Sequence, residues 1–281
     1  MMDNIEREIR NEITQNLELK TMPSNDSIGG QNPDPIIVVE NLTARFGDDT
    51  ILENVSFEVS RGEIFIILGG SGCGKSTLLK HMIGLHELAS GRVTINGIDI
   101  TSADDNEMGK LRRGMGMLFQ SSALFGSMTL YENVALPLME FTHLPLKIID
   151  PIVKTKLGMV GLSGYENHLP SELSGGMKKR AGIARAIALD PTVLFFDEPS
   201  AGLDPVTSAE LDILIRNLNK GIGTTMVIVT HELESIFNVA HRIIMLDKSK
   251  KGIIAEGDPR ELKEHSENPR VTNFFNRKAT H

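Results

Sequence analysis

Apolar and polar positions follow two different periodicities along this chain. Between residues 36 and 68, short runs rich in β-branched residues cover 36–39, 42–46, 55–59 and 64–68, with Gly-Asp-Asp and Arg-Gly turns between them. Such runs predict a small antiparallel sheet that leads into a buried strand at 64–68. Residues 91–100 predict a further hairpin, because Asn96-Gly97 at their centre is a strong turn signal.

Beyond the first buried strand, strand patterns alternate with helix patterns. Apolar runs at 117–119, 192–196 and 225–229 predict strands, and amphipathic patterns at 78–83, 178–188 and 208–218 predict helices. This alternation predicts a mostly parallel sheet with helices on its faces. Residues 121–173 are mostly helical in pattern, with breaks expected at Pro137, Pro145, Pro151 and Pro170. They predict a helical insertion between strands of an α/β core.

The two ends of the chain differ from this central part. Residues 1–20 place Ile5, Ile9, Ile13 and Leu17 at four-residue steps, which fits either a partner-docking helix or a marginal helix that frays alone. Residues 21–35 are rich in Pro, Ser, Asn, Asp and Gly and predict a linker. We therefore expect an N-terminal extension at 1–35, a folded domain at 36–248 with its helical subdomain at about 121–178, and a C-terminal extension at 249–281.

Composition narrows the possible partners. The 281 residues include 29 basic and 37 acidic side chains, for a net charge of −8, and the basic residues form no long stripe. Nucleic acid is therefore not an expected partner. No apolar run approaches the roughly 20 residues that span a bilayer, and the first residues lack the apolar core of a secretory signal. The single cysteine, Cys73, forms no internal disulfide, which suits a reducing cytosol.

Residues 69–77 carry a glycine-rich phosphate-binding motif between a predicted strand and a predicted helix. Glycines let backbone N–H groups approach a phosphate chain, and the start of a helix favours an anion. Lys75 would reach the β- and γ-phosphates, Ser76 would hold Mg²⁺, and Thr77 would meet a phosphate oxygen. A turn that binds nothing is disfavoured by the complete G-x-x-x-x-G-K-S spacing. The predicted phosphate contacts are Gly69, Gly70, Ser71, Gly72, Cys73, Gly74, Lys75, Ser76 and Thr77.

Two carboxylates follow the apolar run at 192–196. Asp197 is a candidate Mg²⁺ ligand through water, and Glu198 is a candidate base that polarises the attacking water. Taken alone, an Asp-Glu pair after an apolar strand is usually a solvated strand end. Together with Lys75 and Ser76, the functional interpretation is favoured.

In their order along residues 36–248, these motifs resemble those of the ABC (ATP-binding cassette) ATPases. The resemblance implies ATP and Mg²⁺ as cofactors and a P-loop NTPase (RecA-like) α/β core with an antiparallel β-subdomain and an inserted α-helical subdomain. It also implies roles for further residues: Gln120 in the Q-loop at nucleotide and metal, Ser174, Gly175 and Gly176 in the signature, Asp204 in the D-loop, His231 as the switch histidine and Phe46 as the ring that stacks on adenine. A strand-end role for His231 and a core role for Phe46 remain the alternatives.

The signature has a consequence for assembly. Ser174 and its glycines precede a predicted helix, so their N–H groups suit a γ-phosphate. By the family's architecture the signature cannot reach the phosphate loop of its own chain, which implies a head-to-tail homodimer with each ATP between Lys75 of one copy and Ser174 of the other. Lys75, Glu198 and His231 are then the catalytic set. Met177 stands where most members carry Gln, so a polar contact is lost there.

The residues around Met177 resemble the ATPase subunits of the Mla (maintenance of lipid asymmetry) phospholipid transporters, as do 119–125, 132–138 and 268–275. The resemblance implies a peripheral subunit on the cytoplasmic side of the inner membrane that drives phospholipid transport across the bacterial cell envelope. Its partners would be a membrane permease, an MCE-domain subunit and a small STAS-domain protein. Phe274 and Phe275 would dock on the neighbouring ATPase subunit or fold back onto their own domain.

Two other functions remain open at this point. The chain could serve another ABC solute importer, because the transported lipid never touches this subunit. A soluble ABC protein that acts on the ribosome or on DNA is the alternative of another class. Such proteins usually carry two cassettes, a long coiled coil or a basic surface, and none of these is visible in the sequence.

Overall fold

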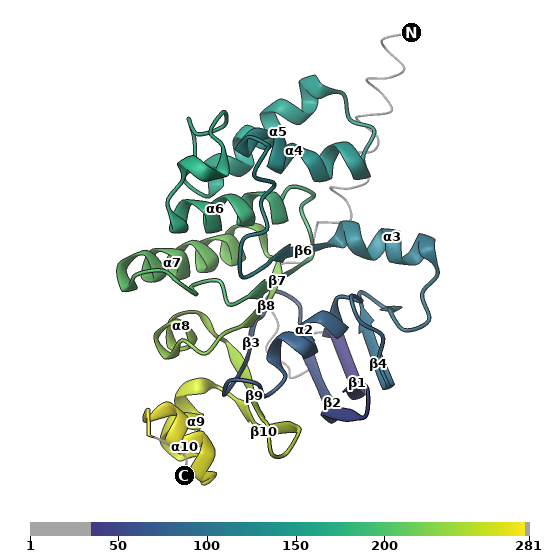
Figure 1. Cartoon of the computed structure of the whole chain (residues 1–281), viewed down its shortest axis with the longest axis vertical. Helices are drawn as coiled ribbons and strands as arrows, with labels where there is room; N and C mark the ends of the chain where they lie inside the picture. Colours follow the sequence, from purple (N-terminus) through teal and green to yellow (C-terminus); the bar gives the residue numbers. More distant parts are fainter. Residues whose placement is uncertain (1–34, 279–281) are drawn as a thin grey trace, which may run out of the picture. The chain divides into compact units, whose positions relative to one another are not determined.

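The structure is a computed structural model that describes residues 35–278 (Figure 1). The apolar stripe predicted at residues 1–20 lies outside the described residues. Among residues 35–278, none of the helices combines the length and the apolarity that crossing a membrane requires.

The first sheet is the predicted antiparallel β-subdomain. Its four strands lie in the order β2–β1–β4–β5 and pair antiparallel throughout. The sequence predicts two strands at 36–39 and 42–46, but they form one strand, because a bulge at Asn41 (φ 49°) absorbs the irregularity between them. The strand bounds are Pro35–Phe46 for β1, Asp49–Ser60 for β2, Ser90–Ile95 for β4 and Ile98–Asp99 for β5.

The second sheet is the predicted α/β core. Its six strands lie in the order β10–β9–β3–β8–β7–β6, and all pairs are parallel except the antiparallel pair β10–β9. Because β10 belongs to it, the sheet continues beyond residue 248. The bounds are Ile64–Gly69 for β3, Met115–Leu118 for β6, Val193–Asp197 for β7, Thr225–Val229 for β8, Arg242–Asp247 for β9 and Gly252–Gly257 for β10.

Helices connect these strands. The bounds are Lys75–Met82 for α2, Asp105–Gly114 for α3, Leu130–Phe141 for α4, Leu146–Met159 for α5, Gly175–Ala186 for α6, Pro205–Ile222 for α7, Leu233–Val239 for α8, Pro259–His265 for α9, Pro269–Phe275 for α10 and Pro170–Glu172 for the 3₁₀ helix η1. Helix α3 was not predicted, because it is polar and buries only Leu111. A capping box between Asp104 and Glu107 begins it.

The prolines of the helical segment behave differently from the prediction. Pro145 precedes α5 and Pro170 begins η1, as expected for breaks, but Pro137 lies inside α4 and Pro151 inside α5. The prediction of a break at these two positions was wrong. An internal proline costs a helix about 3 kcal/mol, and tertiary packing offsets that cost, since Leu138 and other residues of both helices are fully buried in the core.

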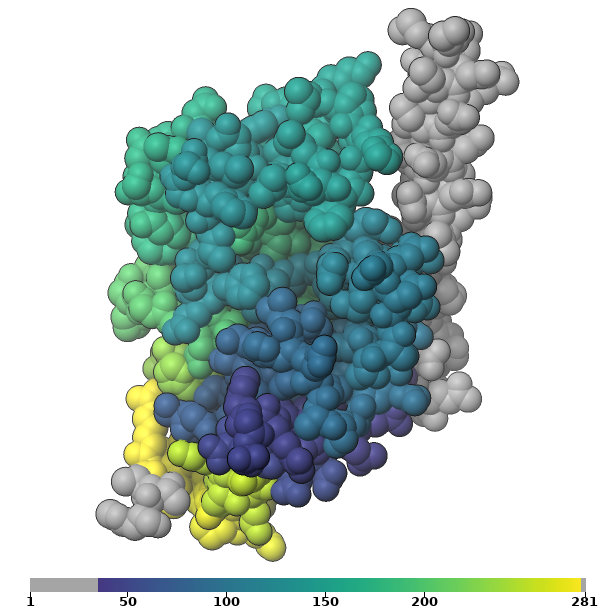
Figure 2. Space-filling view, turned by 45° about the vertical axis from the view of Figure 1, so that its right-hand side comes forward, coloured from purple at the N-terminus to yellow at the C-terminus, as the bar shows by residue number. Residues whose placement is uncertain are grey.

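Strand β3 positions the phosphate loop between two cores. All its residues are buried, and they alternate: Ile64, Ile66 and Leu68 face a core shared with α4 to α8, while Phe65 and Ile67 face a core shared with the small sheet and α2. The central sheet is therefore covered on both faces, as parallel sheets require. Figure 2 shows the surface of this arrangement, with the teal helical segment α4–α5 at the top and the purple strands β1 and β2 in the lower half, above the yellow C-terminal segment.

Candidate functional site

The phosphate loop, residues 69–77, joins the end of β3 to the start of α2. Glycine is required at two of its positions. A Cβ on Gly69 would lie 2.5 Å from the carbonyl oxygen of Leu246, and one on Gly74 would lie 2.9 Å from Leu52 Cδ2. Both residues also have positive φ, at 150° and 102°. The loop therefore holds its backbone in the form that a phosphate cradle needs.

Lys75 is the first residue of α2, and its ammonium group lies inside the loop. Its Nζ donates to the carbonyl oxygens of Gly69 at 2.8 Å and Gly70 at 3.2 Å, and the residue is only 9% exposed. A phosphate held by the loop would offer this cation a charge-assisted hydrogen bond, which is stronger than a bond to a neutral carbonyl.

Ser76 and Asp197 meet although they are far apart in the sequence. The Ser76 hydroxyl donates to Asp197 Oδ1 at 3.1 Å, because the carboxyl ends of β3 and β7 open at the same edge of the sheet. Hydroxyl, amide and carboxylate oxygens are the ligands Mg²⁺ prefers, and this ion is usually completed by substrate phosphates and water. The residues therefore fit Mg²⁺. In the part of the chain that the structure describes, no cluster of three His, Cys, Asp or Glu offers a site independent of a nucleotide.

Glu198 and His231 form the second pair of the site. His231 Nδ1 lies 2.9 Å from each carboxylate oxygen of Glu198. Glu198 is 9% exposed and adopts φ 48°, a left-handed conformation that is uncommon for a residue other than glycine. Its N–H donates to the carbonyl of Val229 at 2.9 Å. The strand-end alternative for His231 is thus replaced by a specific contact with the candidate base.

One cavity of about 620 Å³ gathers these groups. The sequence did not predict one member of its wall, Phe274 of α10. That ring reaches the site because the C-terminal helix folds back onto its own domain, where its neighbour Phe275 packs against Phe237. Cys73 and Asp197 lie beside this cavity rather than in its lining. The lining residues are Gly69, Gly70, Ser71, Gly72, Gly74, Lys75, Ser76, Thr77, Gln120, Glu198, His231 and Phe274.

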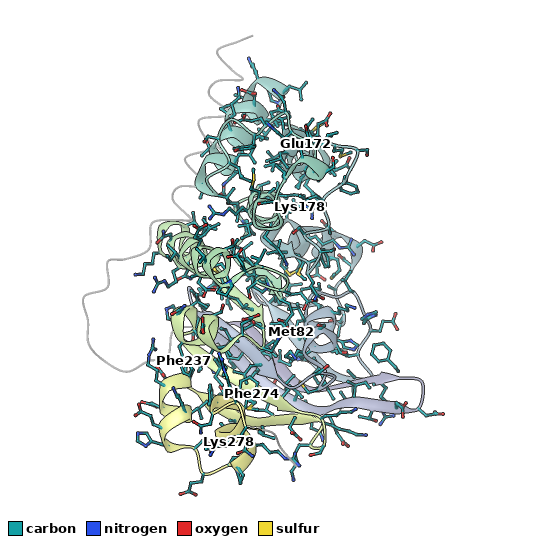
Figure 3. The ribbon with its side chains drawn as sticks, turned by 60° about the vertical axis from the view of Figure 1, so that its left-hand side comes forward. Met82, Glu172, Lys178, Phe237, Phe274 and Lys278 are labelled. Atoms are coloured by element: carbon teal, nitrogen blue, oxygen red, sulfur yellow. The ribbon has the colours of Figure 1, made fainter. Side chains whose placement is uncertain are left out.

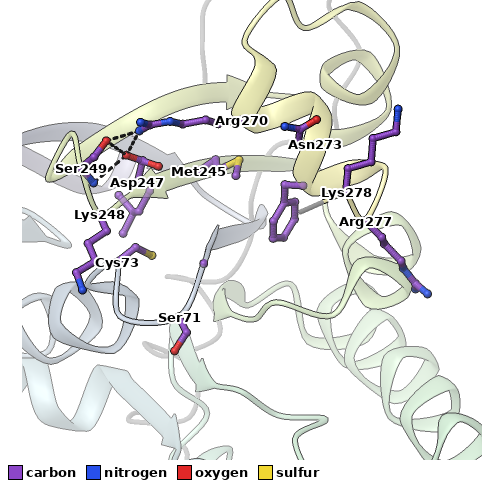
Figure 4. Close-up of a pocket in the computed structure, with 13 residues that line it drawn as sticks. Ser71, Cys73, Met245, Asp247, Lys248, Ser249, Arg270, Asn273, Arg277 and Lys278 are labelled. Carbon is purple, nitrogen blue, oxygen red and sulfur yellow. Dashed lines mark hydrogen bonds and ion pairs between the residues drawn. The ribbon is translucent and has the colours of Figure 1, made fainter. Parts of the chain in front are cut away.

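A second cavity of about 730 Å³ shares Gly70, Ser71 and Phe274 with the first (Figure 4). It lies between the phosphate loop, the end of β9 and α10. Arg270 reaches across it to Asp247 and Ser249. Cys73 closes the side formed by the loop, and burial raises the pKa of its thiol. The thiol therefore stays protonated at neutral pH.

Phe46 lies at the turn between β1 and β2 and is outside the lining of the first cavity. Its ring is 51% exposed and stands edge-on to His86, with ring centroids 5.9 Å apart. The alternative that Phe46 belongs to the core is wrong. An exposed aromatic ring is available to a planar ligand such as a base.

The signature segment, residues 173–177, uses its polar groups locally. Ser174 is the N-cap residue of α6, and its hydroxyl accepts from the Met177 N–H at 3.2 Å. Gly176 packs against α7, since a Cβ there would lie 2.5 Å from Thr207 Cγ2. The side chain of Met177 packs on the core. Apolar packing thus takes the place of the hydrogen bonds that a glutamine would make.

Asp204 is the N-cap residue of α7. Its carboxylate accepts from the N–H groups of Val206 and Thr207 at 3.1 Å and from the Thr207 hydroxyl at 2.6 Å. Hydrogen bonds from Thr207 hold the pKa of Asp204 below its ordinary value. The D-loop residue therefore has a structural task within its own chain.

The signature and the phosphate loop line different cavities. Ser174, Gly176 and Met177 line a small cavity of about 230 Å³ with residues of α7. Within residues 35–278, neither the signature glycines and serine nor Asp204 line the 620 Å³ cavity. In Figure 3, Glu172 and Lys178, which flank the signature segment, lie well apart from Phe274. The predicted separation of the two motifs is thus present in the structure.

Comparison with known proteins extends this picture. Residues 52–201 match the family model described as ABC transporter. The ATP-binding protein MlaF of the intermembrane phospholipid transport system of Haemophilus influenzae is 42% identical over 240 residues, covering 85% of this chain and 90% of the relative. The probable ribonucleotide transport ATP-binding protein mkl of Mycobacterium leprae is 44% identical over 253 residues, covering 89% of this chain and 72% of the relative.

A solved structure agrees with the fold. The ATP-binding cassette MJ0796, a dimer in a post-hydrolysis state bound to ADP and phosphate, matches with a TM-score of 0.71 and 33% identity, covering 79% of this chain and 98% of that chain. The family model spans more than half of the chain, and the sequence relatives match over most of their own length. The chain therefore belongs to the ABC transporter family, as an ATP-binding subunit with the ABC ATPase fold.

Proposed function

We propose that the chain hydrolyses ATP between two of its copies and so drives a transporter that moves phospholipid across the bacterial cell envelope. The observation that carries the proposal is the meeting of Lys75, Ser76, Glu198 and His231 around one cavity, where a phosphate cradle faces a candidate base. Lys75 and Ser76 come from the start of α2, Glu198 follows β7 and His231 follows β8, and their convergence gives each of them a role in the same reaction.

The nucleotide would be held at its two ends. Lys75, Thr77 and the N–H groups of the phosphate loop bind the phosphates, because a helix start and a buried cation both favour negative charge. Phe46 stacks on adenine through its exposed ring. These contacts hold the γ-phosphate at the side of the cavity where Glu198 lies.

Mg²⁺ would be held by Ser76 and Gln120, with Asp197 acting through water. When bound, this ion neutralises charge on the phosphate oxygens. The Ser76 to Asp197 hydrogen bond of 3.1 Å supports this assignment, because it already brings two oxygen ligands together.

Glu198 would take the proton from the attacking water. A general base needs a fixed position near its proton. The contact of 2.9 Å from His231 and the hydrogen bond from the Glu198 N–H supply that position. His231 would contact the γ-phosphate while it holds the Glu198 carboxylate, so binding of the phosphate and the position of the base would be linked through this one residue.

A second copy of the chain would complete each site. Ser174, Gly175 and Gly176 at the start of α6 cover the γ-phosphate of the partner's nucleotide, with Asp204 beside them. Two observations support this arrangement: the signature lines a separate cavity in its own chain, and the similar cassette MJ0796 is a dimer. The pair has twofold symmetry and two equivalent sites.

A groove between the helical segment and β6 supports a membrane permease as a partner. This groove of about 330 Å³ is mostly apolar, and Phe125 and Phe141 at its wall are 50% and 42% exposed. Exposed apolar surface of this kind marks an interaction site. The chain would thus be peripheral, on the cytoplasmic side of the inner membrane. An MCE-domain subunit and a small STAS-domain protein complete the proposed complex.

Phospholipid is favoured as cargo by the name of the MlaF relative and by the residues around Met177. A ribonucleotide is the second candidate, because the mycobacterial relative of similar identity carries that name. The cargo is chosen by the permease in either case, so the experiment has to include it.

The test is recovery of the tagged chain with its complex from the native membrane, followed by mass spectrometry of proteins and lipids. We expect a permease, an MCE-domain subunit and enriched phospholipid, and ATP-dependent lipid transfer after reconstitution into vesicles. The same complex carrying Glu198→Gln is the matched control and should transfer no lipid. A permease without bound lipid, with ATP-dependent ribonucleotide uptake, would contradict the phospholipid proposal and support the second candidate.

A further inference from the structure

Lys179 is a buried cation for which the proposed reaction has no role. It lies on α6, five residues after Ser174, and is 5% exposed. Its Nζ donates to the backbone carbonyl of Gln120 at 2.6 Å and to that of Glu198 at 3.2 Å. Burying a lysine without a carboxylate bond is unfavourable, so a lysine in this position needs a reason.

The two carbonyls belong to the two loops that meet at the reacting phosphate. One is the Gln120 loop, residues 119–125, which follows β6, and the other is the turn after β7 that carries Glu198. Both contain residues with left-handed backbone: Ser122 at φ 63°, Ala123 at φ 47° and Glu198 at φ 48°. Such conformations persist only where their surroundings hold them. Lys179 bonds to both loops.

Helix α6 holds the Gln120 loop at a second point as well. Arg185 donates to the carbonyls of Ala123 at 2.7 Å and Ser122 at 3.0 Å. Between the two cations, Gly182 packs so closely that a Cβ there would lie 2.6 Å from Leu118 Cδ1. The Gln120 loop and α6 are therefore joined along two turns of helix, and Lys179 extends that joint to Glu198.

The same loop continues into the proposed permease groove. Asn133 of α4 accepts from the Phe125 N–H at 2.8 Å and donates to the Phe125 carbonyl at 3.1 Å. Phe125 lines the groove, as do Phe119 of the loop and Arg185 of α6. A partner seated in the groove would thus press on a segment whose other end is bonded through Lys179 to the turn of Glu198.

We propose that Lys179 is a positioning residue that ties the Gln120 loop to the turn of Glu198, so that an occupant of the groove and the position of the base are coupled. The proposal rests on the proposed function, in which Glu198 is the base. Lys179 touches neither nucleotide nor metal in this scheme, because it acts through the backbone of the residues that do.

The test compares Lys179→Met with Lys178→Met in the full chain, purified with its membrane partners. Methionine is one atom shorter than lysine, keeps an unbranched apolar chain and removes all three donors. Lys178 is the adjacent, half-buried lysine of the same helix. We expect kcat of K179M to fall roughly 10- to 100-fold, the scale of a misplaced reacting group. KM should stay within about twofold of wild type, because the phosphate loop and Phe46, which carry most of the proposed nucleotide contacts, do not bond to Lys179. K178M should match wild type, and K179R should recover part of the lost kcat.

Hydrogen exchange gives a readout that does not depend on turnover. The amides of Ser122 and Ala201 donate to Phe119 at 2.8 Å and to Glu198 at 3.2 Å, one in each loop. In K179M both amides should exchange faster than in K178M. If K179M does not fold, Lys179→Gln, which keeps donors without the charge, is measured in its place with the same expected direction.

The outcomes separate this inference from the proposed function. Equal kcat in K179M and K178M, or unchanged exchange at both amides, overturns the role of Lys179 while the ATPase proposal stands. A wild-type complex without ATP turnover overturns the proposed function, and the exchange measurement still decides whether Lys179 joins the two loops.

Discussion

The phosphate-loop half and the signature half of the proposed site are built in opposite ways. The first half draws side chains from several strand ends into one cavity, where Lys75 and Glu198 are each 9% exposed and hydrogen bonded. The second half comes from the start of a single helix, where Ser174 and Gly175 are exposed and, within residues 35–278, the serine hydroxyl bonds only to its own helix. Convergence of distant segments fixes the first half, and local capping fixes the second.

One chain by itself supplies only one of the two halves that a proposed site needs. The buried half has Lys75, the candidate base Glu198 and its partner His231 in place without a second protein. The exposed half offers backbone donors to a ligand that its own chain cannot bring to it. One chain thus carries the two halves of different sites, and only a second copy joins them.

The largest effect should come from separating the halves. Ser174→Arg should abolish turnover while ATP still binds, because the arginine blocks the exposed half only. Lys75→Ala should abolish turnover through the buried half. Mixing equal amounts of the two variants should restore roughly a quarter of the wild-type rate, since half of the dimers are then mixed and each has one intact site. Steady-state ATP hydrolysis measures this directly.

A site formed within one chain would contradict the division into two halves. In that case mixing restores nothing, and dilution to monomer leaves the wild-type rate per chain unchanged. Analytical ultracentrifugation of the same samples provides the necessary control for the state of association.

Changing the base should have the next largest effect. Glu198→Gln keeps the shape of the side chain but removes its basicity, so hydrolysis should slow by roughly 10²–10⁴-fold, the usual contribution of a general base. ATP affinity should be retained. Glu53→Gln, on the exposed face of β2, is the matched control for loss of one charge. Normal turnover in E198Q would remove Glu198 from the reaction.

Substitution of Phe46 tests whether its ring contributes to ATP affinity in the phosphate-loop half. Phe46→Ala should weaken ATP binding roughly 5- to 150-fold, which corresponds to the about 1–3 kcal/mol of a stacked base. Phe46→Tyr should bind like wild type, because it keeps the ring. Isothermal titration with the isolated chain suffices, since this residue belongs to the half that needs no partner. Equal loss with a base-free triphosphate would show that stacking is not the cause.

The smallest effect concerns the capping of the exposed half. The pKa of Asp204 is depressed in the folded chain, so its ionised form contributes stability above the unfolded pKa and loses that contribution as pH falls through the folded pKa. Asp204→Asn should therefore lower Tm slightly at pH 7, and the difference should be smaller at about pH 3, which lies below the unfolded pKa and approaches the depressed folded pKa. A Tm difference that is the same at both pH values would contradict this origin.

Local motifs allowed much of the site to be predicted. The glycines, Lys75 and Ser76 have a fixed spacing, and the buried strands on either side determine where the loop lies. Asp197 is the last residue of β7, so the apolar run before it also determines where its carboxylate lies. The hydrogen bond between Ser76 and Asp197 then follows from the topology of a parallel sheet, which the alternating pattern predicts.

Residues that act through long-range packing were missed. Phe274 lines the cavity because α10 folds back onto its own domain. The sequence leaves that return open as one of two alternatives, and no local pattern decides between them. Lys179 looks like a solvated lysine until its place between Gly176 and Ile183 on the buried face of α6 is considered. The sequence predicts breaks at Pro137 and Pro151 because the cost of a proline is local, whereas the packing that offsets it is not.

The single cysteine of the chain lies at the seam between the two cavities. Cys73 is 2% exposed although it lines the second cavity, so its sulfur is largely shielded from a reagent in this conformation of the loop. A protonated, shielded thiol is alkylated only during brief openings. The rate of alkylation of the unaltered chain would therefore measure how often the phosphate loop opens. A change in that rate on addition of nucleotide would show how the nucleotide alters the opening, without any introduced label.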